Sequence, residues 1–442
     1  MIPDPGELDR THHDEAHGYR GRPVPWRLLP DSARVGDDGW LAIGGCSTAD
    51  VVAEFGTPMF VYDEDHLRAR CREAVATFGE GVSYAGKAFL CLAMARLVHE
   101  EGMHLDVATG GELHVALAAG VPAERLVLHG NNKSDAELAR AREVGVGRVV
   151  VDSFDELDRL DRLHAADGRV PTVLLRATPG VEAHTHEFVQ TGQIDSKFGF
   201  GVAAGDLAKA VERATAVPSV DLVGVHLHIG SQVFVAEFFR QAVGVIAPWV
   251  RDLDLPELSI GGGLGVPYVA GEEAPTLGQW GRVVIDACRA AGIRSHVTAE
   301  PGRAIAAQAA VTLYSVGTLK EIPGVRTYVA VDGGMSDNPR PVLYGSGYEA
   351  FLPRAADAPR PRAVTVVGKH CESGDLLVRD ARVPADTAVG DVHATPVTGA
   401  YGHSMGSNYN KVPRPAVVFA RGGDARLVVR RETHDDLVRL DV

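Results

Sequence analysis

Short apolar runs alternate with longer polar-faced stretches from about residue 80 to about residue 305, and this alternation constrains the fold more than any other feature. Eight runs have the composition of buried strands: GVSYAGK, MHLDVAT, RLVLHG, GRVVVD, TVLLRAT, LVGVHLHIG, ELSIGGGLG and SHVTAEPG. Amphipathic stretches with apolar residues at helical spacing separate the first four. Such strands are typical of a parallel sheet covered on both faces, and eight βα units in about 230 residues match a closed barrel. The sequence therefore predicts an α/β fold with a (β/α)8 barrel.

The pattern changes after residue 310, where strand-like runs follow one another with loops between them. These runs are VTLYSVGTLKEI, TYVAVDGG, AVTVVGKHCESGD, PAVVFARGG and ARLVVRRE, and the early run WLAIGGCS resembles them. We therefore expect a mostly β second domain that includes the early run. The expected parts are a loose N-terminal arm at 1–30, an N-terminal part of the β domain at 31–55, the barrel at 56–308 and the C-terminal β domain at 309–442.

The composition argues against several classes of protein. Lys and Arg number 44 against 58 Asp and Glu, the formal net charge is -14 and no basic face stands out, which argues against a nucleic-acid partner. No apolar run is long enough to span a bilayer and no signal peptide is recognisable, so we expect no membrane association. Five scattered cysteines form neither a CxxC pair nor a disulfide framework, which indicates a reducing cytoplasm.

The predicted barrel strands end in polar or glycine-rich clusters. In a (β/α)8 barrel the active site lies at the C-terminal ends of the strands. The first strand ends at Lys87, the sixth in HLHIGSQ, the seventh in GGGLG and the eighth in EPGR. This density of polar groups indicates an active site at the barrel mouth.

The glycines at the last two strand ends favour a phosphate site. Gly261, Gly262 and Gly263 allow a ligand to approach the backbone closely and expose N–H donors to an anion, and Gly302 follows on the next strand. A tight turn is the alternative explanation of the glycine run. Because this barrel often binds phosphate with the loops after strands seven and eight, the position favours the phosphate interpretation.

A phosphate-anchored cofactor and a strand-end lysine suggest pyridoxal 5'-phosphate. Lys87 would form the Schiff base, which needs an accessible neutral amine. Glu300 would be the carboxylate partner of the protonated pyridine nitrogen. His228 would lie against the ring, although a satisfied core histidine stays open for that residue alone. Ser231 would donate to the phosphate, and we assign His226 a structural role.

The chain carries a series of motifs that resembles the diaminopimelate decarboxylases. The motifs are YAGKAFL, DVATGGEL, HLHIGSQ, GGGLG, EPGRAI, DGGMSDNPRPVLY, CESGD and GAYGHSMGSNYN, in this order, and the resemblance runs from about residue 40 to the C-terminus. The family comprises fold-type III pyridoxal-phosphate enzymes, related to ornithine and arginine decarboxylases and more distantly to alanine racemase. The resemblance implies the barrel and β domain of that group. It also implies decarboxylation of meso-2,6-diaminopimelate to L-lysine and carbon dioxide, the last step of lysine biosynthesis.

The resemblance further implies a homodimer with shared active sites and a role for each motif residue. The catalytic residues would be Lys87 as the Schiff-base lysine, His228 as the ring-stacking residue and Cys371, which enters from the partner subunit. The cofactor would be bound by Lys87, His228, Ser231, Gly263, Glu300, Gly302, Arg303 and Tyr401. The substrate would be bound by Arg303, Arg340, Tyr344, Glu372 and Tyr401, with Glu372 taking the distal ammonium from across the dimer. Cys371 is the favoured proton donor to the carbanion, and Lys87 is the other candidate.

The residue types agree with a substrate that has an amino-acid group at both ends. Two arginines can bind a distal carboxylate and a glutamate the distal ammonium, whereas ornithine has no distal carboxylate. A racemase of this fold would be expected to place an arginine against the pyridine nitrogen, so Glu300 argues against it. A non-catalytic regulator should have lost Lys87 or Cys371. A decarboxylase of another amino acid, such as ornithine or arginine, stays open.

Histidines in two segments raise the question of a metal. His12, His13 and His17 lie in the polar N-terminal stretch, where a solvated arm is expected, and His184 and His186 have no further ligand at metal spacing. We therefore expect no metal site.

Overall fold

The computed structural model describes residues 22–181 and 195–442 of the chain. The chain divides into two compact units, one formed by Met1–Leu67, Pro267–Glu273 and Ala306–Val442, the other by Arg68–Val266 and Ala274–Ile305. We name them the β unit and the barrel unit. Residues 1–21 of the expected N-terminal arm, and the segment with His184 and His186, lie outside the described residues.

The barrel unit contains parallel strands in chain order around a nearly complete circle. The strands are β5 (Ser83–Ala85), β6 (His104–Val107), β7 (Leu126–Leu128), β8 (Arg148–Val151), β9 (Thr172–Thr178), β11 (Asp221–Leu227), β12 (Glu257–Ser259) and β13 (His296–Thr298). The short strand β10 (Phe200–Gly201) pairs with β9. Ser83 N donates to Ala299 O at 2.9 Å and Ala85 N to Pro301 O at 3.3 Å, which joins the first strand to the segment after the last. The predicted eight-stranded barrel is confirmed.

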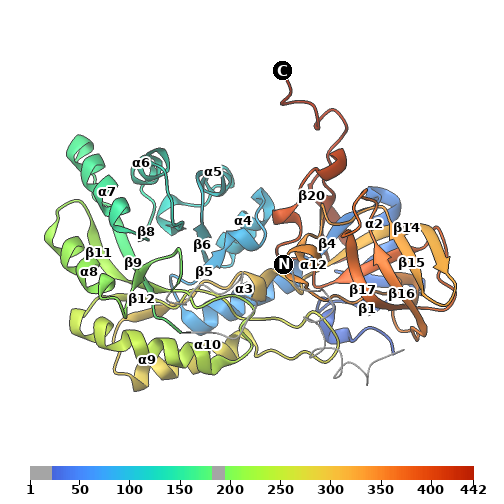
Figure 1. Cartoon of the computed structure of the whole chain (residues 1–442), viewed down its shortest axis with the longest axis horizontal. Coiled ribbons are helices and arrows are strands. Elements are labelled where there is room, and N and C mark those ends of the chain that lie inside the picture. The colour runs from blue at the N-terminus through green and yellow to red at the C-terminus, as the bar shows by residue number, and fades with distance from the viewer. Residues whose placement is uncertain (1–21, 182–194) are drawn as a thin grey trace. The chain divides into compact units, whose positions relative to one another are not determined.

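Helices connect successive strands, and Figure 1 shows α5, α6 and α7 outside β6 and β8. The helices are α3 (Glu64–Phe78), α4 (Leu92–Glu100), α5 (Gly110–Ala118), α6 (Asp135–Val144), α7 (Phe154–Asp167), α8 (Asp206–Ala216), α9 (Ala236–Leu253), α10 (Leu277–Ala290) and α11 (Arg303–Ala306). Local sequence fixes their ends. Ser134 and Glu137 form a capping box at the start of α6, and Gly145 ends that helix in the left-handed conformation. The chain therefore enters and leaves α6 at defined residues.

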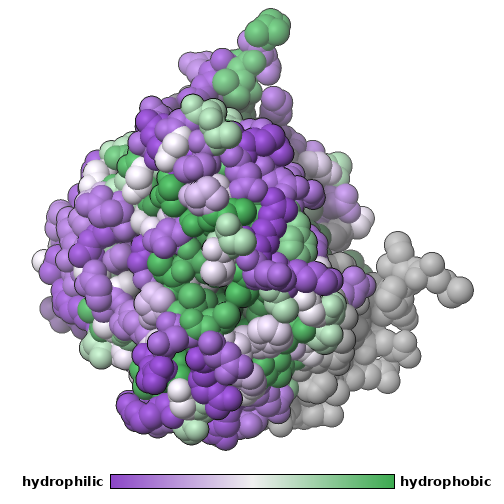
Figure 2. Space-filling model, turned by 90° about the vertical axis from the view of Figure 1, so that its left-hand side faces the viewer, coloured by the Kyte–Doolittle hydropathy of each residue, from purple (hydrophilic) through white to green (hydrophobic). Residues whose placement is uncertain are grey.

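The helices of the barrel unit turn polar faces outward and apolar faces towards the strands. Figure 2 shows the side of α7 and α8 as mostly hydrophilic around a central band of hydrophobic residues. Inside, Trp280 of α10 is fully buried. Its ring lies 5.2 Å from the ring of Phe78 and 5.3 Å from that of Phe239, both edge-on. This aromatic cluster ties α3, α9 and α10 together.

The β unit is built on one mixed sheet in the order β17-β16-β15-β14-β4-β19-β20, with β18 also paired to β14. Its strands are β4 (Met59–Asp63), β14 (Ala310–Ile322), β15 (Arg326–Val331), β16 (Arg362–Val367), β17 (Leu376–Val383), β18 (Val392–Pro396), β19 (Ala416–Arg421) and β20 (Asp424–Val429). A small second sheet contains β1 (Arg34–Val35), β2 (Leu41–Ile43) and β3 (Cys46–Ser47), followed by α2 (Thr48–Phe55). Leu41 and Ile43 share a hydrophobic core with Val61 and Val311, so the early run WLAIGGCS belongs to this unit.

Four strands of the β unit were not predicted from the sequence: β1, β4, β17 and β18. β4 matters most, because it lies inside the range 56–308 expected for the barrel. It pairs with β14 and β19 in the middle of the mixed sheet. Its five residues are all buried, so it has no alternation of polar and apolar residues that would mark it as part of a sheet. The helix α12 (Arg340–Tyr344) lies in this unit as well. No helix among the described residues is long and apolar enough to cross a membrane.

The aromatic cluster of the barrel unit gives a stability prediction. Replacing Trp280 with Ala should lower the free energy of unfolding by about 3–5 kcal/mol, because a large side chain is lost from a fully packed site. Replacing it with Phe should cost less, since Trp280 Nε1 has no hydrogen-bond partner among the described residues. Urea denaturation followed by circular dichroism measures both. Equal effects of the two substitutions would contradict this account.

Candidate active site

Polar side chains gather at the C-terminal ends of the barrel strands, where the sequence predicted the site. Each of the eight barrel strands contributes at least one polar side chain, either from its last residues or from the first two residues after it. The side chains are Lys87, Asp106, His129, Asp152, Arg176, His226, His228, Ser259 and Glu300. Most of them are buried. The barrel mouth therefore contains a network of charged and hydrogen-bonding groups rather than an apolar layer.

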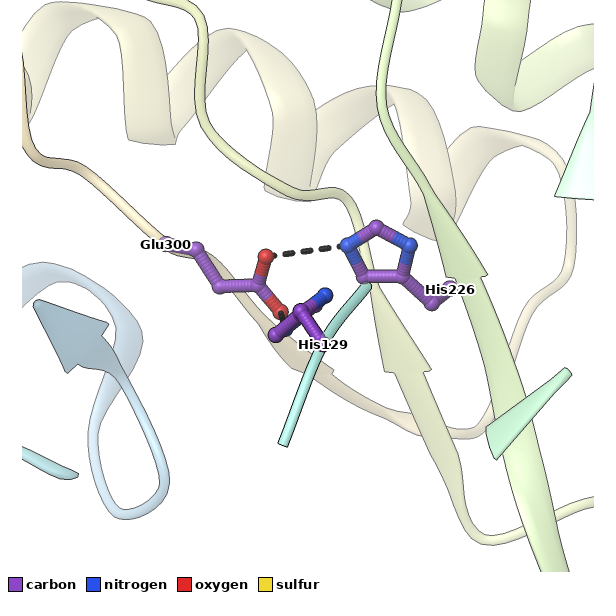
Figure 3. Close-up of side chains that lie close together, drawn as sticks. All are labelled: His129, His226 and Glu300. Atoms are coloured by element: carbon purple, nitrogen blue, oxygen red, sulfur yellow. Dashed lines mark hydrogen bonds and ion pairs between the residues drawn. The ribbon is translucent and has the colours of Figure 1, made fainter. Parts of the chain in front are cut away.

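Glu300 lies at the centre of this network (Figure 3). His226 Nε2 lies 2.9 Å from its Oε2, and Ser259 Oγ donates to its Oε1 at 2.9 Å. His129 Nε2 lies 3.3 Å from Oε1. The two imidazole rings meet edge-on, with centroids 4.9 Å apart and an interplanar angle of 68°. A carboxylate with two oxygens has about four acceptor sites, so these contacts leave one for a further donor.

The surroundings give these groups different charges. Burial raises the pKa of Glu300, but His129 and His226 outweigh that effect and hold it well below its usual value. Burial lowers the pKa of His226 to about 4, so this ring is neutral at pH 7. Burial also lowers the pKa of His129, but the negative charges of Asp106 and Glu300 outweigh it, and its pKa is raised. Glu300 is thus ionised, with one histidine that favours a positive charge and one that is neutral.

Lys87 and His228 lie at the same end of the barrel. Lys87 is exposed in the short turn Gly86–Ala88 that follows β5. Burial and then the positive charge of Lys87 lower the pKa of His228 well below its usual value. His228 Nδ1 accepts a hydrogen bond from Gly262 N at 3.2 Å, so the neutral ring carries its proton on Nε2. Its orientation is therefore fixed by the glycine-rich loop.

The glycine run after β12 is a site of close backbone contact. A Cβ on Gly261 would lie 2.2 Å from Leu227 O, and one on Gly263 would lie 2.3 Å from Gly230 O. Both residues also have positive φ angles, +65° and +105°. Gly261 N donates to Ser259 Oγ and Gly262 N to His228 Nδ1, so these two N–H groups already have partners. Gly263 is thus the member of the run that suits an anion best, and it is the one in the predicted cofactor set.

Arg303 and Ser231 are in direct contact. Arg303 Nη2 donates to Ser231 Oγ at 2.8 Å, and Arg303 is buried. Since Ser231 Oγ accepts this bond, its own proton can be donated elsewhere. The contact supports a paired role for two residues that the sequence analysis considered separately.

A second buried ionic group supports the strand ends from the side of α6 and α7. Lys133 Nζ donates to Gly130 O and Val150 O, both at 2.7 Å, and to Glu156 Oε1 at 2.8 Å. These bonds use all three ammonium protons, so Lys133 links the ends of β7 and β8. Arg176 Nη1 lies 3.6 Å from Asp152 Oδ2. The guanidinium of Arg176 also lies 4.3 Å from the centre of the Phe198 ring. These contacts fix Arg176 in the barrel mouth.

Arg340, the predicted substrate arginine, is held between two tyrosines in the β unit. It begins α12 and is buried. Its guanidinium lies 4.1 Å from the centre of the Tyr268 ring, and its Nη1 donates to Tyr348 Oη at 2.6 Å. Burial lowers its pKa, but Tyr268 and Tyr348 outweigh burial and raise it. A buried cation with few protein acceptors suits an anionic ligand.

The segment that carries Cys371 and Glu372 is tied to the loop before α12. Asp375 accepts from Met335 N at 2.7 Å and from His370 N at 2.9 Å. Cys371 is exposed, and its N–H donates to Asn410 Oδ1 at 3.0 Å. Glu372 is exposed as well, Tyr344 and Tyr401 are partly buried, and Tyr401 has a positive φ of 60°. The carboxylate of Asp375 therefore orients the segment while the predicted functional side chains stay accessible.

The structure thus brings Lys87, His228, Ser231, Gly263, Glu300 and Arg303 together at the mouth of the barrel unit, and Arg340, Tyr344, Cys371, Glu372 and Tyr401 occur in the β unit. Asp106, His129, Asp152 and Arg176 all lie in predicted strand runs, but no role was assigned to them from the sequence. His226, to which a structural role was assigned, bonds Glu300 directly through its Nε2, and that assignment stays a prediction. His226 lies on β11 and His228 directly follows the last residue of that strand, so their spacing of two residues is the signal that could have linked them.

Among the described residues, one group of side chains could in its geometry hold a metal ion: His129, His226 and Glu300. Their ligand atoms all lie within 4.8 Å of one another. The carboxylate already accepts from His226 and Ser259. His129 Nε2 lies 3.3 Å from the same carboxylate but makes no hydrogen bond among the described residues.

Comparison with known proteins gives consistent matches. A family model described as "Pyridoxal-dependent decarboxylase, pyridoxal binding domain" matches residues 64–307. The diaminopimelate decarboxylase of Mycobacterium tuberculosis is 48% identical over 426 residues, covering 91% of this chain and 95% of that protein. That of Bacillus subtilis is 44% identical and covers 94% and 98%. A solved diaminopimelate decarboxylase from M. jannaschii in complex with L-lysine is 31% identical, covers 93% of this chain and 98% of that one, and has a TM-score of 0.87.

The loop before α12 gives a prediction about pH. Burial raises the pKa of Asp337 to about 7, and its carboxylate accepts from Tyr314 Oη and Gly334 N. Since this pKa lies above the usual 3.8, the folded chain binds more protons here than the unfolded chain between about pH 4 and about pH 7. The contribution of Asp337 to stability therefore falls as pH rises through that window.

Urea denaturation at pH 5 and pH 8 checks this prediction. The Asp337→Asn variant should lose part of the wild-type decrease in unfolding free energy between the two values. Asp441→Asn, at an exposed site, is the control and should keep the wild-type decrease. An identical decrease in wild type and Asp337→Asn would contradict the assignment.

Proposed function

The chain belongs to the diaminopimelate decarboxylase family of pyridoxal-dependent decarboxylases, and on that premise we propose that it converts meso-2,6-diaminopimelate to L-lysine and carbon dioxide. The observation that carries the proposal is 48% identity to a curated diaminopimelate decarboxylase over 91% of the chain. This reaction completes the biosynthesis of lysine. The cofactor is pyridoxal 5'-phosphate.

The residues at the barrel mouth suit this cofactor in their chemistry. Lys87 offers an exposed amine for the aldehyde, and Glu300 offers an ionised carboxylate with an acceptor site left for a protonated ring nitrogen. Gly263, Gly302 and Arg303 offer backbone N–H donors for the phosphate, and Ser231 offers a hydroxyl donor. When bound, pyridoxal 5'-phosphate supplies an electron sink for the charge left on the substrate carbon that loses its carboxylate.

The chain's own residues then have defined tasks. Lys87 would hold the cofactor through its amine, at the place that the α-amine of the substrate would take. Glu300 would keep the ring nitrogen protonated, because its own pKa is held low and it stays an anion. His228, neutral and fixed by Gly262, would lie against the ring. Cys371 donates the proton that replaces the lost carboxylate, and its exposure in the CESGD segment agrees with such a role.

Substrate choice rests on the distal end of diaminopimelate. Arg340 is buried between Tyr268 and Tyr348 and presents a cation that a distal carboxylate would neutralise. Arg303 and Tyr344 add donors for the same carboxylate, Glu372 binds the distal ammonium, and Tyr401 completes the pocket. Ornithine has no carboxylate at that end, so Arg340 disfavours it. The same cation gives no advantage to arginine, whose distal group is itself positive.

The proposal includes the assembly and the compartment. We propose a cytoplasmic homodimer in which Cys371 and Glu372 of one subunit complete the active site of the other. Their exposure in the β unit supports this arrangement. The cysteines support a reducing compartment, since none of the five is in a disulfide.

Lys87→Ala tests the cofactor assignment. The variant should lose the visible absorbance of the bound cofactor and release no measurable carbon dioxide, because the chain has lost the amine that holds the aldehyde. Lys209→Ala is the matched control, since Lys209 is an exposed lysine paired with Asp206 on α8. Retained visible absorbance and full turnover in Lys87→Ala would end the proposal.

Arg340→Lys tests the substrate assignment. A lysine cannot form the bidentate hydrogen bonds that an arginine makes with a carboxylate, and it has no planar group to stack between tyrosines. The KM for diaminopimelate should therefore rise about tenfold or more, with a smaller change in kcat. Arg326→Lys, in which a more exposed arginine near Tyr328 is changed, should leave KM unaltered. An unchanged KM in Arg340→Lys would show that the distal carboxylate binds elsewhere.

A further inference from the structure

Two buried carboxylates converge on one imidazole nitrogen in the barrel mouth. His129 Nε2 lies 3.7 Å from Asp106 Oδ1 and 3.3 Å from Glu300 Oε1. The three residues come from β6, the end of β7 and the end of β13, and all are buried. Two carboxylates this close repel each other strongly unless a proton or a cation lies between them. A proton on His129 Nε2 would attract both carboxylates.

The neighbouring His226 has a different task. Its Nε2 lies 2.9 Å from Glu300 Oε2, whereas its buried Nδ1 has no hydrogen-bond partner among the described residues. A neutral imidazole has one N–H, and the ionised carboxylate requires a donor, so the proton of His226 is on Nε2. His226 and Ser259 therefore orient Glu300 without adding charge. The charge that balances the two carboxylates must come from another residue.

Other charged groups face the cluster from the remaining strands. Arg176 of β9 is buried, and its charge acts on both His129 and Glu300, but its nearest acid is Asp152. Lys87 and the neutral His228 follow β5 and β11, and Glu112 of α5 acts on Asp106. Burial raises the pKa of Asp106 to about 6, and the positive charge of His129 opposes that shift. Among these groups, His129 lies within 4 Å of both acids, and their negative charges raise its pKa.

We propose that His129 is a positioning residue, whose proton bridges Asp106 and Glu300 and so keeps Glu300 an ionised, oriented acceptor for the ring nitrogen of the cofactor. The bridge itself is a property of the chain alone. Only its use on the ring nitrogen rests on the proposed function. His129 touches neither the phosphate-binding glycines nor Lys87 in any described contact, so it acts through Glu300.

The bridge makes cofactor binding depend on pH in a stated direction. The folded-state pKa of His129 lies above its unfolded value, so the bridge is complete below about pH 6.5 and is lost as pH rises through the folded-state pKa. Once the proton leaves, Asp106 and Glu300 lose their shared counter-charge. The affinity for the cofactor should therefore fall on the alkaline side.

Nitrogen NMR of the full chain without cofactor tests the bridge directly. In protein labelled with ¹⁵N in the histidine rings, one buried histidine should be an imidazolium at pH 7 and titrate above the usual range. Asp106→Asn should lower the pKa of that signal, which assigns it without altering His129, and His129→Gln should remove it. A neutral His129 at pH 7 would overturn the inference and would leave the proposed decarboxylase activity untouched.

Ligand titration tests the consequence for the cofactor. Pyridoxamine 5'-phosphate, which has no aldehyde to react with Lys87, is titrated into the apo-protein by fluorescence from pH 6.5 to pH 9. His129→Gln should bind it about tenfold to a hundredfold more weakly at pH 6.5, as expected for a lost charge-assisted contact. It should also lack the alkaline decrease of the wild type. His104→Gln, at the opposite end of β6, should match the wild type. Equal affinities and equal pH profiles in all three proteins would overturn the proposal.

Discussion

The buried carboxylate of Glu300 is the constraint on which the barrel unit depends. An isolated charge inside a protein costs too much to persist, so the surrounding strands must supply its partners. Ser259 and His226 donate to it and His129 approaches it, each from a different strand. Because the strands are in register around a nearly closed barrel, these donors reach one point. The fold of this unit and the ionisation of its central acid therefore support each other.

In the β unit the buried charge is a cation, and it too needs partners. Arg340 is buried, and aromatic faces and a phenol replace the water that it lost. Asp375 orients the nearby CESGD segment by accepting hydrogen bonds from two backbone N–H groups, those of Met335 and His370. In both units the groups that the sequence marked as functional are held by partners of opposite or complementary polarity. An acid for a ring nitrogen and a cation for a carboxylate are the two halves of the proposed chemistry.

The sequence was informative about strands and about the residues that end them, because period and position along one strand are local properties. Lys87, His228 and Glu300 were predicted at the barrel mouth for that reason. No role was assigned to His129 or Arg176, because their partners Glu300 and Asp152 lie on other strands, and no local pattern pairs them. Tyr268 beside Arg340 is a similar case. The strand β4 was not predicted because a fully buried strand shows no alternation of polar and apolar residues. Its partners β14 and β19 lie far from it in the sequence, so no local pattern indicates the pairing.

The central claim is that this chain decarboxylates a substrate with an amino-acid group at each end. Carbon dioxide release by the purified protein with pyridoxal 5'-phosphate, measured with meso-2,6-diaminopimelate, ornithine, arginine and lysine side by side, tests it most directly. We predict release from meso-2,6-diaminopimelate, with L-lysine as the product, and far slower release from the other three. Faster release from ornithine, arginine or lysine than from meso-2,6-diaminopimelate would contradict the account.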